Sequence, residues 1–237
     1  MWLYRELLRA IGQETLTVGT LGAFLGDEQI ATNHTTPDPD VLFPLLARAV
    51  KAGIKSCAME VSSHSLVQEK IGPIQYAAAA FTSFSRDHLD FHRHMNDYFA
   101  AKWRLFTEFL LPGAAGFIHT SVDPSLLPAT LPARLAFYGK LPAPYGIDVI
   151  KRDLAGSRVA LRDGKAVHEG DLPFFADHAA ANFLAAWLLV KQSQNVAVPP
   201  AAWRKLRPVP GRLEPVAAPA GKPFVFVNYD SGFASSR

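Results

Sequence analysis

The chain reads Met59-Glu-Val-Ser-Ser-His64 at the end of one short apolar run and Thr82-Ser-Phe-Ser-Arg-Asp-His-Leu-Asp-Phe-His92 directly after another. The two runs, residues 54–59 and 76–81, are bounded by polar residues. Short apolar runs of this kind are typical of buried strands in a parallel sheet. The sequence therefore predicts two strands that each end in acid, hydroxyl and imidazole groups.

The polar residues at these strand ends include Glu60, Asp87 and His88. Because open α/β sheets bind ligands beyond the carboxyl ends of their strands, we expect these side chains to converge on one crevice. Carboxylate oxygen and imidazole nitrogen together suit Mg²⁺ or Mn²⁺ beside a phosphate. Each residue alone also has a plainer interpretation, with Glu60 beside a helix N-cap, His88 as a loop donor and Lys102 as a solvated helix charge. Their combination and order favour metal and phosphate chemistry.

The rest of the chain alternates between helical and strand patterns, which predicts an α/β fold with a mostly parallel, doubly wound sheet. Residues 116–170 change to short alternating runs and predict a small antiparallel sheet packed onto the parallel one. Apolar residues at helical spacing predict helices at residues 1–12, 40–52, 96–111, 177–192 and 201–206. In the second of these helices the expected buried face is Leu42, Leu45, Leu46 and Val50.

Composition indicates a globular body, because 49% of the 237 residues are hydrophobic and 19% are charged. The net charge of +3 is mild and the basic residues are spread out, so no nucleic-acid partner is expected. No apolar stretch reaches the roughly 20 residues of a membrane span, and the N-terminus lacks the form of a signal peptide. The expected location is the cytoplasm. The single cysteine, Cys57, excludes an internal disulfide and is predicted to be buried in its strand.

Residues 59–71, MEVSSHSLVQEKI, and residues 81–106, FTSFSRDHLDFHRHMNDYFAAKWRLF, closely resemble the central domain of the Mur ligases. Val18-Gly-Thr-Leu-Gly22, Thr32-Asn-His-Thr-Thr-Pro37 and Pro210-Gly-Arg-Leu-Glu214 extend the resemblance over nearly the whole chain. The best fit is to the branch that adds a diamino acid to UDP-N-acetylmuramoyl-L-alanyl-D-glutamate. Ligases that add glutamate to folate or build cyanophycin fit less well.

The resemblance implies a division of the chain into two parts. Residues 1–207 correspond to a central, ATP-binding domain without its phosphate loop, and residues 208–237 correspond to a linker and the start of a truncated C-terminal domain. In the family a loop G-x-x-G-K-[ST]-[ST] precedes the helix that residues 1–12 resemble, and this chain has no such loop. We therefore expect a fragment that is inactive alone. The alternative is a non-catalytic remnant or binding module.

In this family ATP phosphorylates a carboxylate of the substrate, and the incoming amine attacks the acyl phosphate to form an amide. The resemblance assigns Glu60 and His88 as Mg²⁺ ligands, with Asp87 beside them in the catalytic site. Lys102 matches a lysine that family members carry as an N-carbamate, which turns a cation into a bidentate anion that suits a metal-rich site. The expected cofactors are thus Mg²⁺ and the co-substrate ATP.

The resemblance also assigns contacts to UDP-N-acetylmuramoyl dipeptide at Asn33, Thr35, Thr36, Ser62, Gln68 and Lys70. Family members more often carry arginine at position 70, and the plainer interpretations are turn hydroxyls and exposed helix groups. Asn182 and Arg212 match nucleotide contacts, although Ala179 replaces an asparagine of the family pattern and Arg212 could be a surface linker residue. Histidines 64, 92 and 94 are interpreted as hydrogen-bonding loop residues. The identity of the diamino acid and the oligomeric state stay open.

Overall fold

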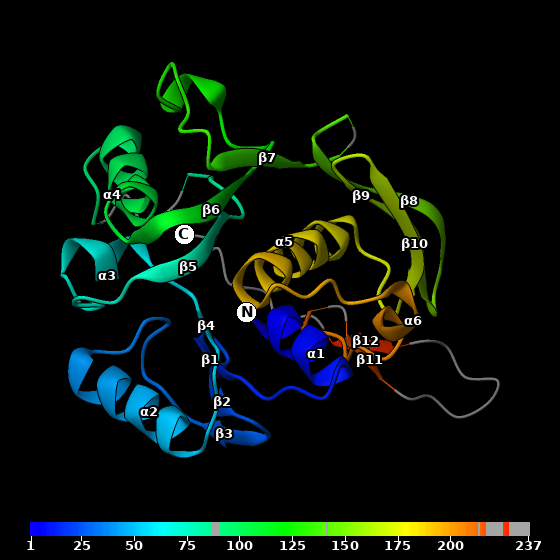
Figure 1. The fold of residues 1–237 in the computed structure, drawn as a ribbon, viewed down its shortest axis with the longest axis horizontal. Coiled ribbons are helices and arrows are strands. Elements are labelled where there is room, and N and C mark those ends of the chain that lie inside the picture. Colours follow the sequence, from blue (N-terminus) through cyan, green and yellow to red (C-terminus); the bar gives the residue numbers. More distant parts are fainter. Residues whose placement is uncertain (87–90, 141, 213, 217–224, 228–237) are drawn as a thin grey trace, which may run out of the picture.

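The computed structural model of the chain describes residues 1–86, 91–140, 142–212, 214–216 and 225–227 (Figure 1). Its helices are α1 (Trp2–Ala10), α2 (Pro39–Lys51), α3 (Ser63–Val67), α4 (Met95–Thr107), the 3-10 turn η1 (Pro124–Leu126), α5 (Asp177–Gln194) and α6 (Pro200–Trp203). Its strands are β1 (Leu16–Gly19), β2 (Gly22–Leu25), β3 (Glu28–Ile30), β4 (Cys57–Met59), β5 (Tyr76–Phe81), β6 (Leu110–His119), β7 (Leu135–Gly139), β8 (Tyr145–Asp153), β9 (Gly156–Asp163), β10 (Ala166–Leu172), β11 (Glu214–Val216) and β12 (Val225–Val227). No helix in these ranges is long and apolar enough to cross a membrane.

The strands form a six-stranded sheet in the order β10-β9-β8-β7-β6-β5, a four-stranded sheet in the order β3-β2-β1-β4, and a separate β11-β12 pair. Neighbours from β5 to β8 are parallel, and so are β1 and β4. The other pairs in these two sheets are antiparallel. Helices α2, α3 and α4 lie on one side of the strands and α1 and α5 on the other (Figure 1). The predicted α/β class with a mostly parallel, doubly wound arrangement is confirmed.

The placement of the antiparallel strands differs from the prediction. Residues 116–170 do not form a separate sheet packed onto the parallel one, because β6 and β7 pair in parallel and β8 to β10 continue the same six-stranded sheet. Two residues connect β8 to β9 and two connect β9 to β10, and such short turns can only join antiparallel neighbours. The alternating pattern detected the strands but not the sheet to which they belong.

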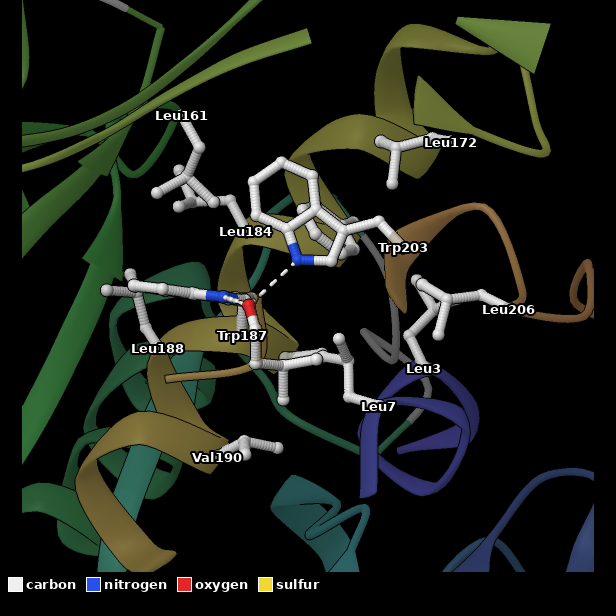
Figure 2. Close-up of a cluster of buried hydrophobic side chains, with 14 of the residues drawn as sticks. Leu3, Leu7, Leu161, Leu172, Leu184, Trp187, Leu188, Val190, Trp203 and Leu206 are labelled. Carbon is white, nitrogen blue, oxygen red and sulfur yellow. Dashed lines mark hydrogen bonds between the residues drawn. The ribbon is translucent and has the colours of Figure 1, made fainter. Parts of the chain in front are cut away.

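The larger core is built around α5. Trp187 and Trp203 are essentially buried, and the indole N–H of each donates a hydrogen bond of 3.0 Å to the carbonyl of Val198. Figure 2 shows the two indoles converging on this oxygen, with leucines of α1, α5 and the six-stranded sheet around them. Because one carbonyl has two lone pairs, it satisfies both buried donors and fixes the segment between α5 and α6.

Two predicted elements have different limits or faces. The helix expected to reach residue 111 ends at Thr107, and Leu110 already begins β6. Only Thr107 and Glu108 interrupt the apolar residues between helix and strand, and helical spacing alone did not mark them as a boundary. In α2 the expected stripe is correct at Leu42 and Leu45, but Val50 is 74% exposed and Ala49 is buried in its place.

Cys57 is exposed, contrary to the prediction, because β4 is the edge strand of the four-stranded sheet. The surrounding protein still raises the pKa of its thiol from an ordinary value of 9.0 to about 12, through desolvation.

This shifted pKa predicts a pH dependence of stability. The folded thiol keeps its proton up to about pH 12, whereas the unfolded thiol loses it near 9.0. Its stabilising contribution is therefore complete below pH 9 and is lost as the pH rises toward 12. Urea unfolding at about pH 8, 9 and 10 should show a falling free energy of unfolding in the wild type and a smaller fall in Cys57→Ser. Equal slopes in the two proteins would contradict the expectation.

Candidate functional site

Glu60 lies directly after β4, at the carboxyl edge of the four-stranded sheet. Its backbone N–H donates to the carbonyl of Val18 at 2.9 Å. Its carboxylate Oε2 accepts hydrogen bonds from the backbone N–H of Thr20 at 3.0 Å and from the Thr20 hydroxyl at 2.7 Å. A Cβ at Gly19 would lie 2.7 Å from the Glu60 carboxyl carbon, so only glycine permits this approach. The carboxylate is therefore held in a fixed position between the ends of β1 and β4.

The segment before α2 is tied to Glu60 through Thr36. The Thr36 hydroxyl donates to the carbonyl of Glu60 at 2.8 Å and accepts from the N–H of Ser62 at 3.1 Å, and Thr36 is only 3% exposed. Ser62 in turn caps α3 by accepting from the N–H of Ser65 at 3.1 Å. The Thr35 and Thr20 hydroxyls lie 3.3 Å apart. A cluster of four hydroxyls thus lies beside the Glu60 carboxylate, contributed by Thr20, Thr35, Thr36 and Ser62.

Other predicted substrate contacts lie around this cluster. Asn33 and Gln68 are exposed, and Gln68 is the C-cap residue of α3. The Lys70 ammonium forms an ion pair of 2.7 Å with Asp38, and this hydrogen bond lowers the pKa of the Asp38 carboxyl. Lys70 is therefore anchored to the start of α2.

Lys102 lies on α4, which follows the polar segment after β5. It extends from α4 and places its ammonium nitrogen 5.1 Å from the centre of the Tyr98 ring and 5.9 Å from that of Phe81. Since Phe81 is the last residue of β5, the Lys102 side chain is held near the carboxyl end of this strand. Arg104 on the same helix donates to the carbonyl of Leu66 at 2.8 Å and links α4 to α3.

Asp87 and His88, the other predicted metal-site residues, lie outside the described residues. Asn182 is exposed on α5, and Arg212 follows α6, where its N–H donates to the carbonyl of Val209 at 3.1 Å. The described part of the chain contains no group of three or more histidine, cysteine or acidic side chains that could hold a metal. The fixed carboxylate of Glu60 and the hydroxyls around it are hard oxygen donors, which fit Mg²⁺ better than a soft metal.

The sequence did not single out two residues of this site. Thr20 lies within the Val18–Gly22 motif, but its contact with Glu60 spans 40 positions and follows only from the pairing of β1 with β4. Ser63 is buried in α3, and its hydroxyl lies 2.9 Å from Nε2 of His92. His92 thus makes the loop hydrogen bond expected of it, and it joins α3 to the segment that precedes α4.

The model of the Mur ligase middle domain matches residues 1–190. The chain belongs to the Mur ligase family. A UDP-N-acetylmuramoyl-L-alanyl-D-glutamate--2,6-diaminopimelate ligase from Mesorhizobium japonicum is 32% identical over 231 residues, which are 95% of this chain and 48% of that relative. A ligase of the same name from Phocaeicola vulgatus is 32% identical over 223 residues, with 92% of this chain and 45% of the relative covered. The chain thus spans about half the length of these curated Mur ligases.

Solved structures agree with this assignment. A structure of a UDP-N-acetylmuramoyl-L-alanyl-D-glutamate--2,6-diaminopimelate ligase has a TM-score of 0.75 and 25% identity, covering 92% of this chain and 45% of that chain. Folylpolyglutamate synthase from Thermotoga maritima has a TM-score of 0.64 at 11% identity, covering 95% of this chain and 58% of that one. At such low identity the second likeness shows the fold alone.

Proposed function

We propose that this Mur ligase chain is the central part of an ATP-dependent ligase that adds a diamino acid to UDP-N-acetylmuramoyl-L-alanyl-D-glutamate. The observation that carries the proposal is the Glu60 carboxylate, fixed by Thr20 beside the hydroxyl cluster of Thr35, Thr36 and Ser62. The names of the similar ligases favour 2,6-diaminopimelate over lysine or ornithine as the added amino acid.

The reaction has two steps that balance without a further reactant. The substrate carboxylate attacks the γ-phosphorus of ATP, which gives an acyl phosphate and ADP. The amine of the diamino acid then attacks the acyl carbon, phosphate leaves, the amine loses a proton and an amide forms. A protein in this role chiefly positions the reactants and neutralises charge.

Glu60, His88 and a carbamoylated Lys102 are the residues that we propose hold Mg²⁺, with Asp87 beside them. The metal would neutralise charge on the phosphate and the acceptor carboxylate. An unmodified Lys102 ammonium would repel a cation, and the position of its nitrogen near the rings of Tyr98 and Phe81 places it close to the end of β5. Asn182 and Arg212 remain the proposed nucleotide contacts.

The residues proposed to recognise the substrate differ in how far their side chains are exposed to solvent. Asn33 and Gln68 are exposed, so we propose that they touch the muramoyl dipeptide directly. Thr36 is buried and its hydroxyl already joins Glu60 to Ser62, so it acts by holding the site together. Lys70, paired with Asp38, presents its charge near the same segment.

Titration of the chain with UDP-N-acetylmuramoyl-L-alanyl-D-glutamate, followed by NMR, tests this proposal. We expect weak binding, with shifts in residues 33–36 and 60–70. Thr36→Val removes the hydroxyl that joins Glu60 to Ser62, with little change in shape. Because this link holds the site together, its loss should weaken binding about 2- to 10-fold, which corresponds to one neutral hydrogen bond of about 0.5–1.5 kcal/mol.

Thr36→Ser keeps the hydroxyl and is the matched control, and Gln68→Ala tests a direct contact. Shifts that are absent at millimolar ligand in a folded chain would rule out substrate recognition by this domain. Shifts that are unchanged by Gln68→Ala would remove Gln68 from the contact surface.

A further inference from the structure

Helices α3 and α4 connect the two parts of the candidate site. Glu60 lies three residues before Ser63, the first residue of α3, and Lys102 lies on α4. The strand before Glu60, β4, belongs to the four-stranded sheet, whereas α4 packs on the six-stranded sheet through Phe99 and Phe106. α3 and α4 lie side by side (Figure 1). The position of Glu60 relative to Lys102 therefore depends on how these two helices are held together.

The amino end of α3 is held by His92, from the segment before α4. The Ser63 hydroxyl lies 2.9 Å from Nε2 of His92, and the two residues are 1% and 5% exposed. Breaking a hydrogen bond between buried polar groups is costly, because the group that loses its partner stays desolvated. Beside this bond the ring centres of His64 and Phe91 lie 4.1 Å apart. Both contacts join the first turn of α3 to the segment that leads into α4.

His92 also reaches the part of α4 that carries Lys102. Its ring centre lies 5.1 Å from that of Tyr98, which is 5% exposed. The Lys102 ammonium nitrogen lies 5.1 Å from the centre of the same tyrosine ring. Tyr98 and Lys102 are four positions apart on the helix, so they lie on one face of it. A continuous set of contacts thus leads from the start of α3 through His92 and Tyr98 to Lys102.

The carboxyl end of α3 is held by Arg104 of α4. Its guanidinium donates to the carbonyl of Leu66 at 2.8 Å. The last carbonyls of a helix have no intrahelical donor and carry partial negative charge, so a cation is a favourable partner for them. The Glu108 carboxylate accepts from Nε of Arg104 at 2.9 Å and pairs with its NH2 group at 2.8 Å. This two-point ion pair fixes the direction of the guanidinium.

Two contacts at opposite ends restrict α3 more than one contact does, because a helix held at a single point can still pivot. α3 has only five residues, too few to be stable as an isolated helix, so its surroundings determine its position. Ligands of one metal ion have to be held within about 0.5 Å of their working geometry. Small movements between α3 and α4 would therefore matter for a metal site that spans both.

We propose that His92 and Arg104 are positioning residues that hold α3 on α4 and thereby set the distance between the Glu60 carboxylate and Lys102. This inference rests on the proposed function, in which Glu60 and Lys102 are ligands of Mg²⁺. The two positioning residues act through α3 and Tyr98 and touch neither metal nor substrate. Without them, Glu60 would keep its hydrogen bonds to Thr20 while α4 moves relative to it.

Paramagnetic broadening by Mn²⁺, measured by NMR on the amide protons of the whole chain, tests this proposal. Mn²⁺ takes the same carboxylate ligands as Mg²⁺ and broadens the signals of protons close to it. In the wild type we expect broadening at residues 61–62, beside Glu60, and at residues 101–103, around Lys102. Glu60→Gln should remove the broadening at both, because a neutral amide is a poorer ligand for this metal than a carboxylate.

Two variants each remove one of the contacts between the helices. His92→Phe keeps an aromatic ring and loses the hydrogen bond to α3, and Arg104→Leu loses the donor to its last turn. In both we expect a partial loss of broadening at residues 101–103 relative to residues 61–62. His92→Gln and Arg104→Lys keep a hydrogen-bond donor and should restore the wild-type ratio. Arg158→Leu, the same change at a half-exposed arginine of β9, is the matched control and should leave the ratio unchanged.

Amide hydrogen exchange separates a failure of the helix contacts from a failure of the metal site. The N–H groups of Leu66 and Gln68 donate to carbonyls one turn earlier and should exchange faster in both variants. An unchanged broadening ratio in folded variants would overturn the positioning role, even where α3 exchanges faster. Broadening at neither segment in the wild type would overturn the Mg²⁺ site of the proposed function and the positioning role with it. If His92→Phe does not fold, Arg104→Leu decides, since the Arg104 side chain is 32% exposed.

Discussion

Replacing Trp203 with alanine is expected to lower the free energy of unfolding by about 3–5 kcal/mol, the usual cost of removing a large aromatic side chain from a core. Trp203 is completely buried and its ring centre lies 5.0 Å from that of Phe183. A Cβ at Gly170 would lie 2.5 Å from the indole, so the backbone of β10 packs directly on this ring. Alanine would leave a cavity among α5, α6 and β10 that these rigid elements cannot close. Urea unfolding followed by circular dichroism measures the loss.

Trp203→Phe is the matched control for this prediction. It retains most of the apolar contact and removes the hydrogen bond to Val198, which also accepts from Trp187 and so keeps one partner. We therefore expect its cost to be well below that of alanine. A loss below about 1 kcal/mol for Trp203→Ala would mean that the cavity collapses, and would contradict the packing described for this core.

Local patterns predicted most elements of this fold, since helices and strands follow from the spacing of apolar residues. The strand at 76–81 has the predicted limits, and the helix at the start of the chain differs from its prediction only at its ends. Sheet membership was not predictable in the same way, because the residues that pair with β8 and β9 are set by turns and by distant contacts. The exposure of Cys57 has the same origin, as it depends on which strand lies beside β4.

For the candidate site, the sequence predicted where the Glu60 carboxylate lies but not the contacts that hold it. The motif around Glu60 identified the carboxylate at a strand end, and the structure places it there. It could not reveal that Thr20 holds this carboxylate or that the Thr36 hydroxyl is already used by Glu60 and Ser62, because these contacts join segments 24 to 40 positions apart. The division of the chain at residue 207 remains a prediction.

An ionic cluster around the buried carboxylate of Glu6 joins α1 to Arg207, which follows α6. Glu6 is 1% exposed, and its carboxylate accepts from Nε and the guanidinium NH2 group of Arg207 at 2.7–3.1 Å and from Arg5 at 3.0 Å. The backbone N–H of Arg207 also donates to Glu6 at 3.1 Å, and the Trp2 indole donates to the carbonyl of Arg207 at 3.2 Å. The cluster therefore fixes the segment between the end of α6 and Pro208 against α1.

We expect Glu6→Ala to cost about 1.5–3 kcal/mol of unfolding free energy, the usual contribution of a hydrogen bond to a charged group, because the lost carboxylate is 1% exposed and accepts from both Arg5 and Arg207. Asp27 provides the matched control, since it also pairs with Arg5 at 2.8 Å but is 76% exposed in its side chain. Asp27→Ala should cost no more than about 1 kcal/mol, as exposed pairs usually do. Chemical denaturation of the two variants under the same salt conditions makes the comparison. Equal losses would show that burial of Glu6 does not determine its contribution to the free energy of unfolding.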